Sequence, residues 1–425
     1  MRILKHKTTI FLLFIVAAAL ILAACGIEAV FSPAAAETAS AAGSSENAAA
    51  LSGSSTESGT ESSSEAFSDR DLSGDYDAAE AVTITLNGTS AAASSEYVKI
   101  SGSTVTITAA GTYLLSGTLD NGSVIVDASK DDKIQLVLDG VTIHSDTFAA
   151  IYVAQADKVF ITLADGSVNT LTNGSGFIQI DDNKVDGVIF SKDDITLNGT
   201  GSLTITSPDA NGIVGKDEVT ITGGAYNITA ANHAIEGKDS IAVSDGTFTL
   251  TAGEDGLHSE NDDDETLGNI YLAGGTFTIT VGDDAIHANT MLQIDGGTFT
   301  ISGAEGLEAT YVQINGGTIS ISATDDGVNA AHKSSVYTPT FEMNDGTLTV
   351  VMGPGDTDGI DSNGNIVVNG GTIDVTGNST FDYDGTAQYN GGTIIVNGQQ
   401  VDSIPNQMMG GGMGNFGGMG GSRRP

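Results

Sequence analysis

The chain has little positive charge. Among its 425 residues, 15 are Lys or Arg and 54 are Asp or Glu, so the formal net charge is −39. Arginine is absent between Arg70 and Arg423. This balance excludes nucleic acid and anionic membrane surfaces as general partners. It suits divalent cations, or polyanions that are reached through divalent cations.

Cysteine is scarce and tryptophan is missing. Cys25 is the only cysteine in the chain. A single cysteine excludes disulfides within the chain, and its place near the N-terminus excludes thiol catalysis and Cys-ligated zinc in the folded region. Because there is no tryptophan and few tyrosines are candidates for exposure (Tyr271, Tyr311 and Tyr383), we do not expect binding by aromatic stacking.

Residues 1–24 have the features of a lipoprotein signal peptide. A basic N-terminal region precedes an apolar run, 8–22, that is too short for a comfortable transmembrane span. The junction Leu-Ala-Ala-Cys resembles the bacterial lipobox, which implies cleavage before Cys25 and lipid attachment to its sulfur. We therefore expect a protein at the cell surface, anchored by lipid to the outer face of the bacterial cytoplasmic membrane. The alternative is an ordinary signal peptide and an extracellular protein.

Two segments have the composition of flexible chain. Residues 25–77 are rich in Ser, Ala and Glu and have almost no large apolar side chain, which predicts a tether. About 50 flexible residues have an r.m.s. reach of roughly 40 Å. Residues 401–425 are rich in Gly and Met, which predicts a disordered tail.

A repeat between these segments predicts a solenoid. Gly-Gly or Asp-Gly pairs recur every 20 to 29 residues and end at Gly224, Gly246, Gly275, Gly297, Gly317, Gly346, Gly371 and Gly392. Each pair separates two runs that alternate apolar and polar residues, which is the pattern of strands with one buried face. Such units predict the coils of a parallel β-helix over residues 78–400.

The coils predict ladders of like side chains in the core. Because coils stack about 4.8 Å apart, Phe248, Phe277 and Phe299 should lie above one another inside the solenoid. Residues 181–400 hold the regular repeats, and residues 78–180 look like less regular coils of the same domain. A separate small β domain before residue 180 is the alternative.

A second motif returns an acidic or polar residue to the same place in each coil. Its form is acidic or polar, Gly or Ala, aliphatic, polar, and its instances begin at Asp186, Asn211, His233, Asp255, Asp284, Glu305, Asp326 and Asp358. The aliphatic position predicts a core ladder that starts with Val188 and Ile213. The positions on either side of it predict two outer ladders rich in oxygen ligands.

The outer ladders predict bound calcium. Carboxylates stacked one coil apart repel each other, and calcium takes six to eight oxygen ligands. The candidates from the pattern are Asp255, Asp283, Asp284, Glu305, Asp325, Asp326 and Asp358. The preference of Asp and Asn for turns explains single positions, but it explains the doubled acids less well. His258 and His287 are poor calcium ligands, so we do not expect metal along the whole ladder.

A lysine ladder accompanies the acidic one. It consists of Lys192, Lys216 and Lys238, with Asp193, Asp217 and Asp239 beside them. Solvated ion pairs explain such a ladder. The alternative is a patch that binds sugar carboxylates or supplies a catalytic base, for which Lys216 and Lys238 are the candidates because they lie in adjacent coils.

The motifs GDDAIHA, GAEGLEA, ATDDGVNAA, GDTDGIDSNGNIVVNGGTI and FDYDG resemble a family of secreted bacterial carbohydrate-binding β-helix proteins, related in fold to pectate lyases. The segment GTYLLSGTLDNGSVIVDA resembles the N-terminal coils of that family. The resemblance covers roughly residues 80–400 and implies a right-handed parallel β-helix with bound calcium. It also implies binding of plant cell-wall polysaccharide, including cellulose and acidic pectic chains. The calcium ligands that it suggests are Asp284, Glu308, Asp326, Asn329, Asp358 and Asp361.

Three functions fit the sequence. The first is a calcium-dependent, noncatalytic protein, monomeric and tethered to the surface, that binds cell-wall polysaccharide. The second is a polysaccharide lyase, which needs a cation and a base, although the solenoid contains no arginine to act as that base. The third is a structural surface adhesin. The sequence favours the first.

Overall fold

The computed structural model describes residues 66–354 and 357–407. They belong to one compact unit, Gly59–Pro425. The predicted signal peptide, Cys25 and most of the predicted tether and tail lie outside the described residues. In the described part of the chain, no helix is long and apolar enough to cross a membrane.

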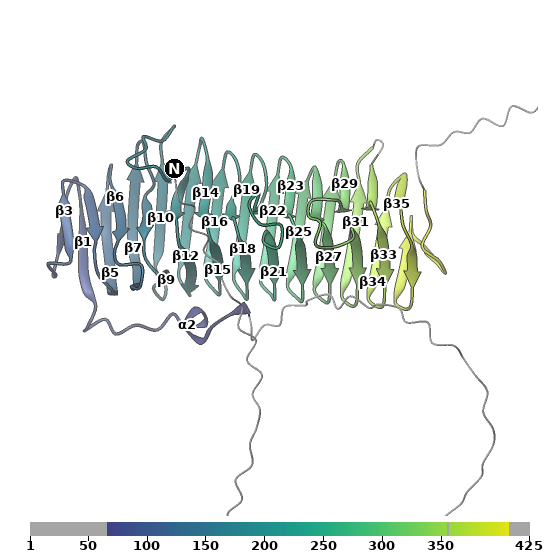
Figure 1. Ribbon diagram of the computed structural model, residues 1–425, viewed down its shortest axis with the longest axis horizontal. Helices are drawn as coiled ribbons and strands as arrows, with labels where there is room; N and C mark the ends of the chain where they lie inside the picture. Colours follow the sequence, from purple (N-terminus) through teal and green to yellow (C-terminus); the bar gives the residue numbers. More distant parts are fainter. Residues whose placement is uncertain (1–65, 355–356, 408–425) are drawn as a thin grey trace, which may run out of the picture. The chain divides into compact units, whose positions relative to one another are not determined.

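The described chain winds as a parallel β-helix, as the repeats predict (Figure 1). We call its first side the ladder face. Its strands are β3 (Val98–Ser101), β4 (Thr104–Ile107), β6 (Ser123–Asp127), β8 (Ile151–Gln155), β11 (Gly187–Ser191), β14 (Asn211–Gly215), β17 (Ile235–Gly237), β20 (Leu257–Ser259), β23 (Asp284–Ala288), β26 (Glu305–Ala309), β29 (Asp326–Ala330), β32 (Asp358–Ser362) and β35 (Ser379–Tyr383).

We call the second side the strap face. Its strands are β9 (Lys158–Leu163), β12 (Asp194–Gly199), β15 (Glu218–Ile221), β18 (Ser240–Val243), β21 (Asn269–Leu272), β24 (Met291–Ile294), β27 (Tyr311–Ile314), β30 (Thr340–Met343), β33 (Asn365–Val368) and β36 (Ala387–Tyr389). Neighbouring strands pair in parallel from one coil to the next.

We call the third side the threonine face. Its strands are β10 (Val168–Asn173), β13 (Ser202–Ser207), β16 (Ala225–Ala230), β19 (Thr247–Ala252), β22 (Thr276–Val281), β25 (Thr298–Gly303), β28 (Thr318–Ala323), β31 (Thr347–Met352), β34 (Thr372–Thr376) and β37 (Thr393–Val396). Three long strands, β1 (Val82–Gly88), β5 (Gly111–Leu119) and β7 (Lys133–Ser145), continue across the corner between the strap and threonine faces. Antiparallel partners flank the two ends, β2 (Ala91–Ala93) on β1, β3 on β4, and β38 (Gln399–Val401) on β37.

The core confirms the predicted stacking of aromatic rings. Strands such as β19, β22 and β25 alternate exposed threonine or serine with buried apolar residues, because β-branched side chains suit a pleated surface with one buried face. The rings of Phe248 and Phe277 stack at 4.5 Å between centroids, and those of Phe277 and Phe299 at 4.7 Å. Full burial of each ring contributes about 1.5–3 kcal/mol.

Glycine at the corner makes this stacking possible. Gly275 has a φ of +104°, and a Cβ there would lie 2.9 Å from the ring of Phe277. The Gly-Gly pairs therefore set the bend from the strap face to the threonine face, and they recur because every coil makes that bend.

The core ladder behind the ladder face confirms the predicted aliphatic position with one correction. Ile213, Ile235, Leu257, Ile286, Leu307, Val328 and Ile360 lie in register from coil to coil. Their neighbour in the preceding coil is Ile189, so the predicted ladder position of Val188 is wrong, although Val188 is buried in the same core. The reason is a shift of one residue, because Gly187 rather than Asp186 lies level with Asn211.

Residues 66–76, which the sequence places in the flexible tether, pack across the strap face. We call this segment, with its helix α2 (Asp69–Leu72), the strap. The Phe67 ring lies 5.9 Å from that of Tyr271, which is buried although the sequence predicts it exposed. The Asp71 carboxylate is buried and lies 2.8 Å from Lys158 Nζ. The strap thus joins coils that are far apart in the sequence.

Candidate functional site

The ladder face carries two columns of polar side chains, one on each side of the core ladder. The first column is Asn211, His233, Asp255, Asp284, Glu305, Asp326 and Asp358. The second column is Glu236, His258, His287, Glu308, Asn329, Asp361 and Asp382. The columns hold all the predicted calcium ligands except Asp283 and Asp325, whose side chains are exposed beside them.

The first column has a structural task that the sequence did not reveal. Asp255 Oδ1 accepts a hydrogen bond from the backbone N–H of Asp284, one coil further on, at 3.0 Å. Asp326 Oδ1 accepts in the same way from the N–H of Asp358 at 3.1 Å. The bend at the start of each strand leaves these N–H groups without a carbonyl partner, and a side-chain oxygen satisfies them. Asp255 and Asp326 therefore each use one carboxylate oxygen to hold the turn, and their other oxygen can contact a further group.

Histidines contact the carboxylates in the early part of the columns. The Nδ1 atoms of His233 and His258 lie 3.2 and 2.7 Å from Asp255 Oδ2. Burial raises the pKa of Asp255, but the hydrogen bonds from these two histidines outweigh it and hold the pKa well below the usual range. The two imidazole rings stack, with centroids 4.1 Å apart. Asp255 Oδ2 therefore has two histidine partners in this part of the columns.

His287 does the same for the next coil. Its Nδ1 lies 2.8 Å from both Asp284 Oδ2 and Glu308 Oε2. Burial lowers the pKa of His287, but hydrogen bonds to the two carboxylates raise it to about 10, so the ring is charged at neutral pH. Lys333 Nζ adds a second positive charge 2.9 Å from Glu308 Oε1. The carboxylates predicted as calcium ligands here already have cationic partners.

The later part of the columns has no such partners. Burial, together with neighbouring carboxylates, raises the pKa of Glu305 to about 8 and that of Asp326 to about 7. The same causes raise the pKa of Asp361 to about 6. Among the described residues, no lysine, arginine or histidine forms an ion pair with these three side chains. Acids are therefore stacked without cationic partners from β26 to β32.

Buried oxygens without partners occur in the same region, as they also do at Asn173 and Asp186 in earlier coils. Asn329 Oδ1, Asp358 Oδ1 and Asp382 Oδ1 are buried and accept no hydrogen bond from the described residues. Asn329 donates its own amide protons to Glu305 Oε2 at 3.1 Å and Glu308 Oε1 at 3.2 Å, which leaves its oxygen facing the column. Buried acceptors of this kind are uncommon, and a hard cation with oxygen ligands satisfies them. The residues of this region fit calcium.

A cleft of about 390 Å³ opens over the columns where the two parts meet. Its lining is His233, Glu254, Asp255, His258, Asp283, Asp284, His287, Glu305, Glu308 and Lys333. Among the described residues, three groups bring ligand atoms within 4.8 Å of one another: His233, Asp255 and His258; Asp255, Asp284 and His287; Asp284, Glu305 and Glu308. The last group has only oxygen donors and joins the cleft to the region that fits calcium.

The predicted lysine ladder has other partners than the sequence suggests. Lys216 Nζ lies 2.8 Å from Glu236 Oε1, and Lys238 Nζ lies 2.7 Å from Asp263 Oδ2. The hydrogen bond to Asp263 raises the pKa of Lys238. The amino groups of both candidate bases therefore lie in ion pairs with carboxylates.

Comparison with known proteins connects this geometry to carbohydrate. A family model described as carbohydrate-binding domain-containing protein matches residues 101–357 and 303–403. A curated protein of the same description from Acetivibrio thermocellus is 43% identical over 128 residues, which are 30% of this chain and 45% of the relative. The chain thus matches less than half the length of that relative.

A solved structure extends the comparison. The polysaccharide lyase-like protein from C. thermocellum, determined as a gadolinium derivative, aligns with a TM-score of 0.51 and 34% identity. The alignment covers 57% of this chain and 94% of that one. It supports both the β-helix and the predicted resemblance.

Proposed function

The chain belongs to the family of carbohydrate-binding domain-containing proteins, and we propose that it binds acidic plant cell-wall polysaccharide through calcium held on the ladder face. The observation that carries this proposal is the uncompensated part of the two columns, where Glu305, Asp326 and Asp361 lie without cationic partners and buried oxygens lack hydrogen bonds.

Electrostatics supports a cation in this region. Two carboxylates one coil apart repel by about 3.5 kcal/mol at a separation of about 4.8 Å and an effective dielectric of about 20. The oxygen donors that would hold calcium are those of Glu305, Asp326, Asn329, Asp358 and Asp361. Calcium, when bound, would neutralise the column and offer coordination positions to the carboxylate of an acidic sugar.

The cleft beside this region supplies groups of its own. Lys333 and the charged His287 line it and can donate hydrogen bonds to an anionic sugar. Glu254 and Asp283 lie on the same cleft and can accept hydrogen bonds from sugar hydroxyls. A chain of formal charge −39 repels a polyanion in general, so these cations and the metal would decide where an acidic chain binds.

We propose that the protein binds without catalysis. Lys216 and Lys238, the candidates for a lyase base, are held in ion pairs, and the solenoid has no arginine. A polysaccharide lyase remains the alternative that the likeness to a lyase-like protein favours. An assay for unsaturated uronate on polygalacturonate, with and without calcium, separates the two.

The location of the protein is also a proposal. We infer from the Leu-Ala-Ala-Cys junction that Cys25 carries a lipid and that the monomeric solenoid is tethered outside the cytoplasmic membrane. A lipid anchor would then be its contact with the membrane. A purely structural adhesin would share this anchor but would not need the uncompensated column.

Pectate binding tests the proposal. We expect the domain to bind polygalacturonate in calcium and to lose binding in EDTA. Asp326→Ala and Asp358→Ala should each weaken binding by about tenfold or more, since each removes an oxygen donor from the column. Asp131→Ala is the matched control, because Asp131 is an exposed aspartate of a loop away from the columns. Binding that survives chelation, or equal losses in the control, would show that the calcium mechanism is wrong.

A further inference from the structure

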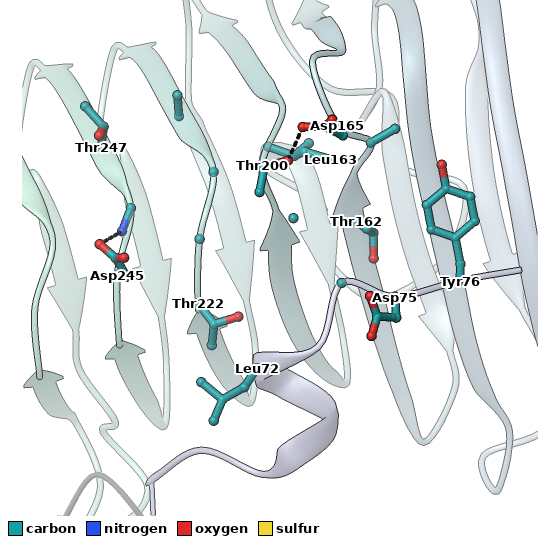
Figure 2. A pocket seen from close by; sticks show the side chains of 17 residues that line it. Leu72, Asp75, Tyr76, Thr162, Leu163, Asp165, Thr200, Thr222, Asp245 and Thr247 are labelled. Carbon is teal, nitrogen blue, oxygen red and sulfur yellow. Dashed lines mark hydrogen bonds between the residues drawn. The ribbon is translucent and has the colours of Figure 1, made fainter.

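A groove of about 730 Å³ lies on the other side of the solenoid from the ladder columns, between the strap and the turns of successive coils (Figure 2). One wall is the strap, from Leu72 to Tyr76. The other wall is formed by the corners of four coils, and includes Thr162, Leu163, Ala164, Asp165, Gly199, Thr200, Thr222, Gly223, Gly224, Ala225, Asp245, Gly246 and Thr247. The groove therefore runs along the solenoid axis.

The strap wall is fixed in place. Asp71 accepts a hydrogen bond from Thr196 Oγ1 at 2.5 Å in addition to its ion pair with Lys158. Asn198 Nδ2 donates to Ser73 O at 3.1 Å, and Gln135 Nε2 donates to the backbone oxygen of Asp75 at 3.3 Å. Contacts on both sides of Gly74 thus hold Asp75 and Tyr76 over the groove. A preformed wall of this kind is typical of a ligand site.

Glycines at the corners of the coils keep side chains out of the opposite wall of the groove. Gly199 has a φ of +95°, and a Cβ there would lie 2.2 Å from Leu163 O. Gly224 has a φ of +98°, with the Leu163 side chain 2.9 Å from the position of a Cβ. No larger residue can stand at these corners, so backbone groups are exposed to whatever lies in the groove.

The groove offers groups that suit a sugar. Thr200 Oγ1 donates to Asp165 Oδ1 at 2.9 Å, as Figure 2 shows. Asp245 Oδ1 accepts from the N–H of Gly246 at 2.7 Å, and its Oδ2 has no hydrogen-bond partner among the described residues. Asp75 is exposed on the strap. Carboxylate oxygens accept strong hydrogen bonds from hydroxyl groups, and the half-buried ring of Tyr76 offers an apolar surface with a polar end.

The charge of the lining residues determines which class of sugar the groove can bind. Three carboxylates line it, and no lysine, arginine or histidine is among its lining residues. None of the groups that bring three such ligand atoms together among the described residues includes these aspartates. An acidic chain would be repelled, whereas a neutral one can donate its hydroxyls to the carboxylates.

We propose that this groove binds a neutral polysaccharide chain, separately from the acidic chains of the ladder face. The threonine face continues the groove along the axis. Thr247 lies at the rim and starts a column in register over the following coils: Thr276, Thr298, Thr318, Thr347, Thr372 and Thr393. A parallel column holds Thr249, Thr278, Thr300, Ser320 and Thr349. The hydroxyls of these coils can meet a long chain that leaves the groove, and the second column ends where Asp374 follows Thr349.

The proposal rests on the proposed function, since it assumes that the family's carbohydrate binding extends to this chain. Calorimetry with cellotriose and cellohexaose, both neutral, tests it on the solenoid with its strap. We expect the longer sugar to bind more tightly. Tyr76→Ala and Asp245→Ala should each weaken binding of cellohexaose by about tenfold or more. Tyr97→Ala is the matched control, because Tyr97 is 54% exposed and lies outside the groove.

The outcomes separate this proposal from the calcium proposal. Loss of cellohexaose binding in Tyr76→Ala, with polygalacturonate binding in calcium unchanged, supports the groove. Full cellohexaose binding in that variant overturns it, and so does a loss confined to Asp358→Ala. If the parent binds polygalacturonate but no neutral sugar, the groove proposal fails and the proposed function stands. If the parent binds neither, both fail.

Discussion

At Glu305, Asp326 and Asp361 the folded chain holds protons that an unfolded chain would release. Their pKa values rise to about 8, about 7 and about 6, because they are buried beside other carboxylates. Ordinary values are about 4. Between about pH 4 and 8 the folded state therefore binds more protons than the unfolded state, and without a cation the free energy of unfolding should fall as pH rises.

Asp326→Asn tests this at one residue. The substitution keeps the oxygen that accepts from the N–H of Asp358 but removes the charge. In EDTA, we expect the melting temperature of the parent to decrease from pH 5 to 8 and that of the variant to decrease less. At pH 8 the variant should be more stable by about 1–2 kcal/mol after allowance for solvent screening. Asp131→Asn, on the surface, should follow the parent. Equal pH slopes for all three proteins would contradict the assigned pKa shifts.

At the scale of elements, the strap is the part of the described structure that the sequence least reveals. Its residues have the composition of the tether, and α2 has only four residues. Its position depends on contacts with strands far along the chain, such as Asp71 with Lys158. The coils, in contrast, follow from local alternation and from the Gly-Gly corners, so their register could be predicted nearly throughout.

Asp71→Ala tests the hold of the strap. It leaves the half-buried amino group of Lys158 without its ion-pair partner and removes the acceptor of the Thr196 hydrogen bond, which should cost about 1–3 kcal/mol. We expect residues 66–76 to exchange amide hydrogens faster and to be cut sooner by proteases, while the ladder face keeps its protection. The double variant Asp71→Ala/Lys158→Met should regain part of the lost stability, because no half-buried charge then lacks its partner. Asp69→Ala is the control, since Asp69 is exposed in the same helix. Unchanged exchange in Asp71→Ala would show that the ion pair does not hold the strap.

At the scale of the whole molecule, the repeat predicts where each side chain of the two columns lies, but not which side chains it contacts. The two outer columns lie where the motif places them, because a parallel β-helix stacks equivalent residues. Which side chains join within the columns depends on rotamers that no repeat encodes. For this reason the sequence could suggest Asp255 and Asp284 as calcium ligands, but it could not predict the contacts that they make with His233, His258 and His287. The sequence did not predict the groove, because one wall of the groove is the strap and the sequence places those residues in the flexible tether.

Calcium bound between β26 and β35 should stabilise the whole solenoid. In a stack of coils each unit is held by its neighbours, so repulsion concentrated between β26 and β35 should weaken the C-terminal coils first. Calcium that binds the folded column raises stability by mass action, by about 2.7 kcal/mol at a concentration one hundred times its Kd.

We therefore expect a higher melting temperature in calcium than in EDTA and a smaller rise in magnesium, which demands a stricter geometry. Hydrogen exchange should show the gain first in β29, β32 and β35. Asp358→Ala should lose most of the calcium effect, while His258→Ala should keep it, because His258 contacts Asp255 in the early part of the columns, away from the region that fits calcium. Identical melting curves with and without calcium, together with no metal in elemental analysis, would leave turn formation as the role of the returning acids.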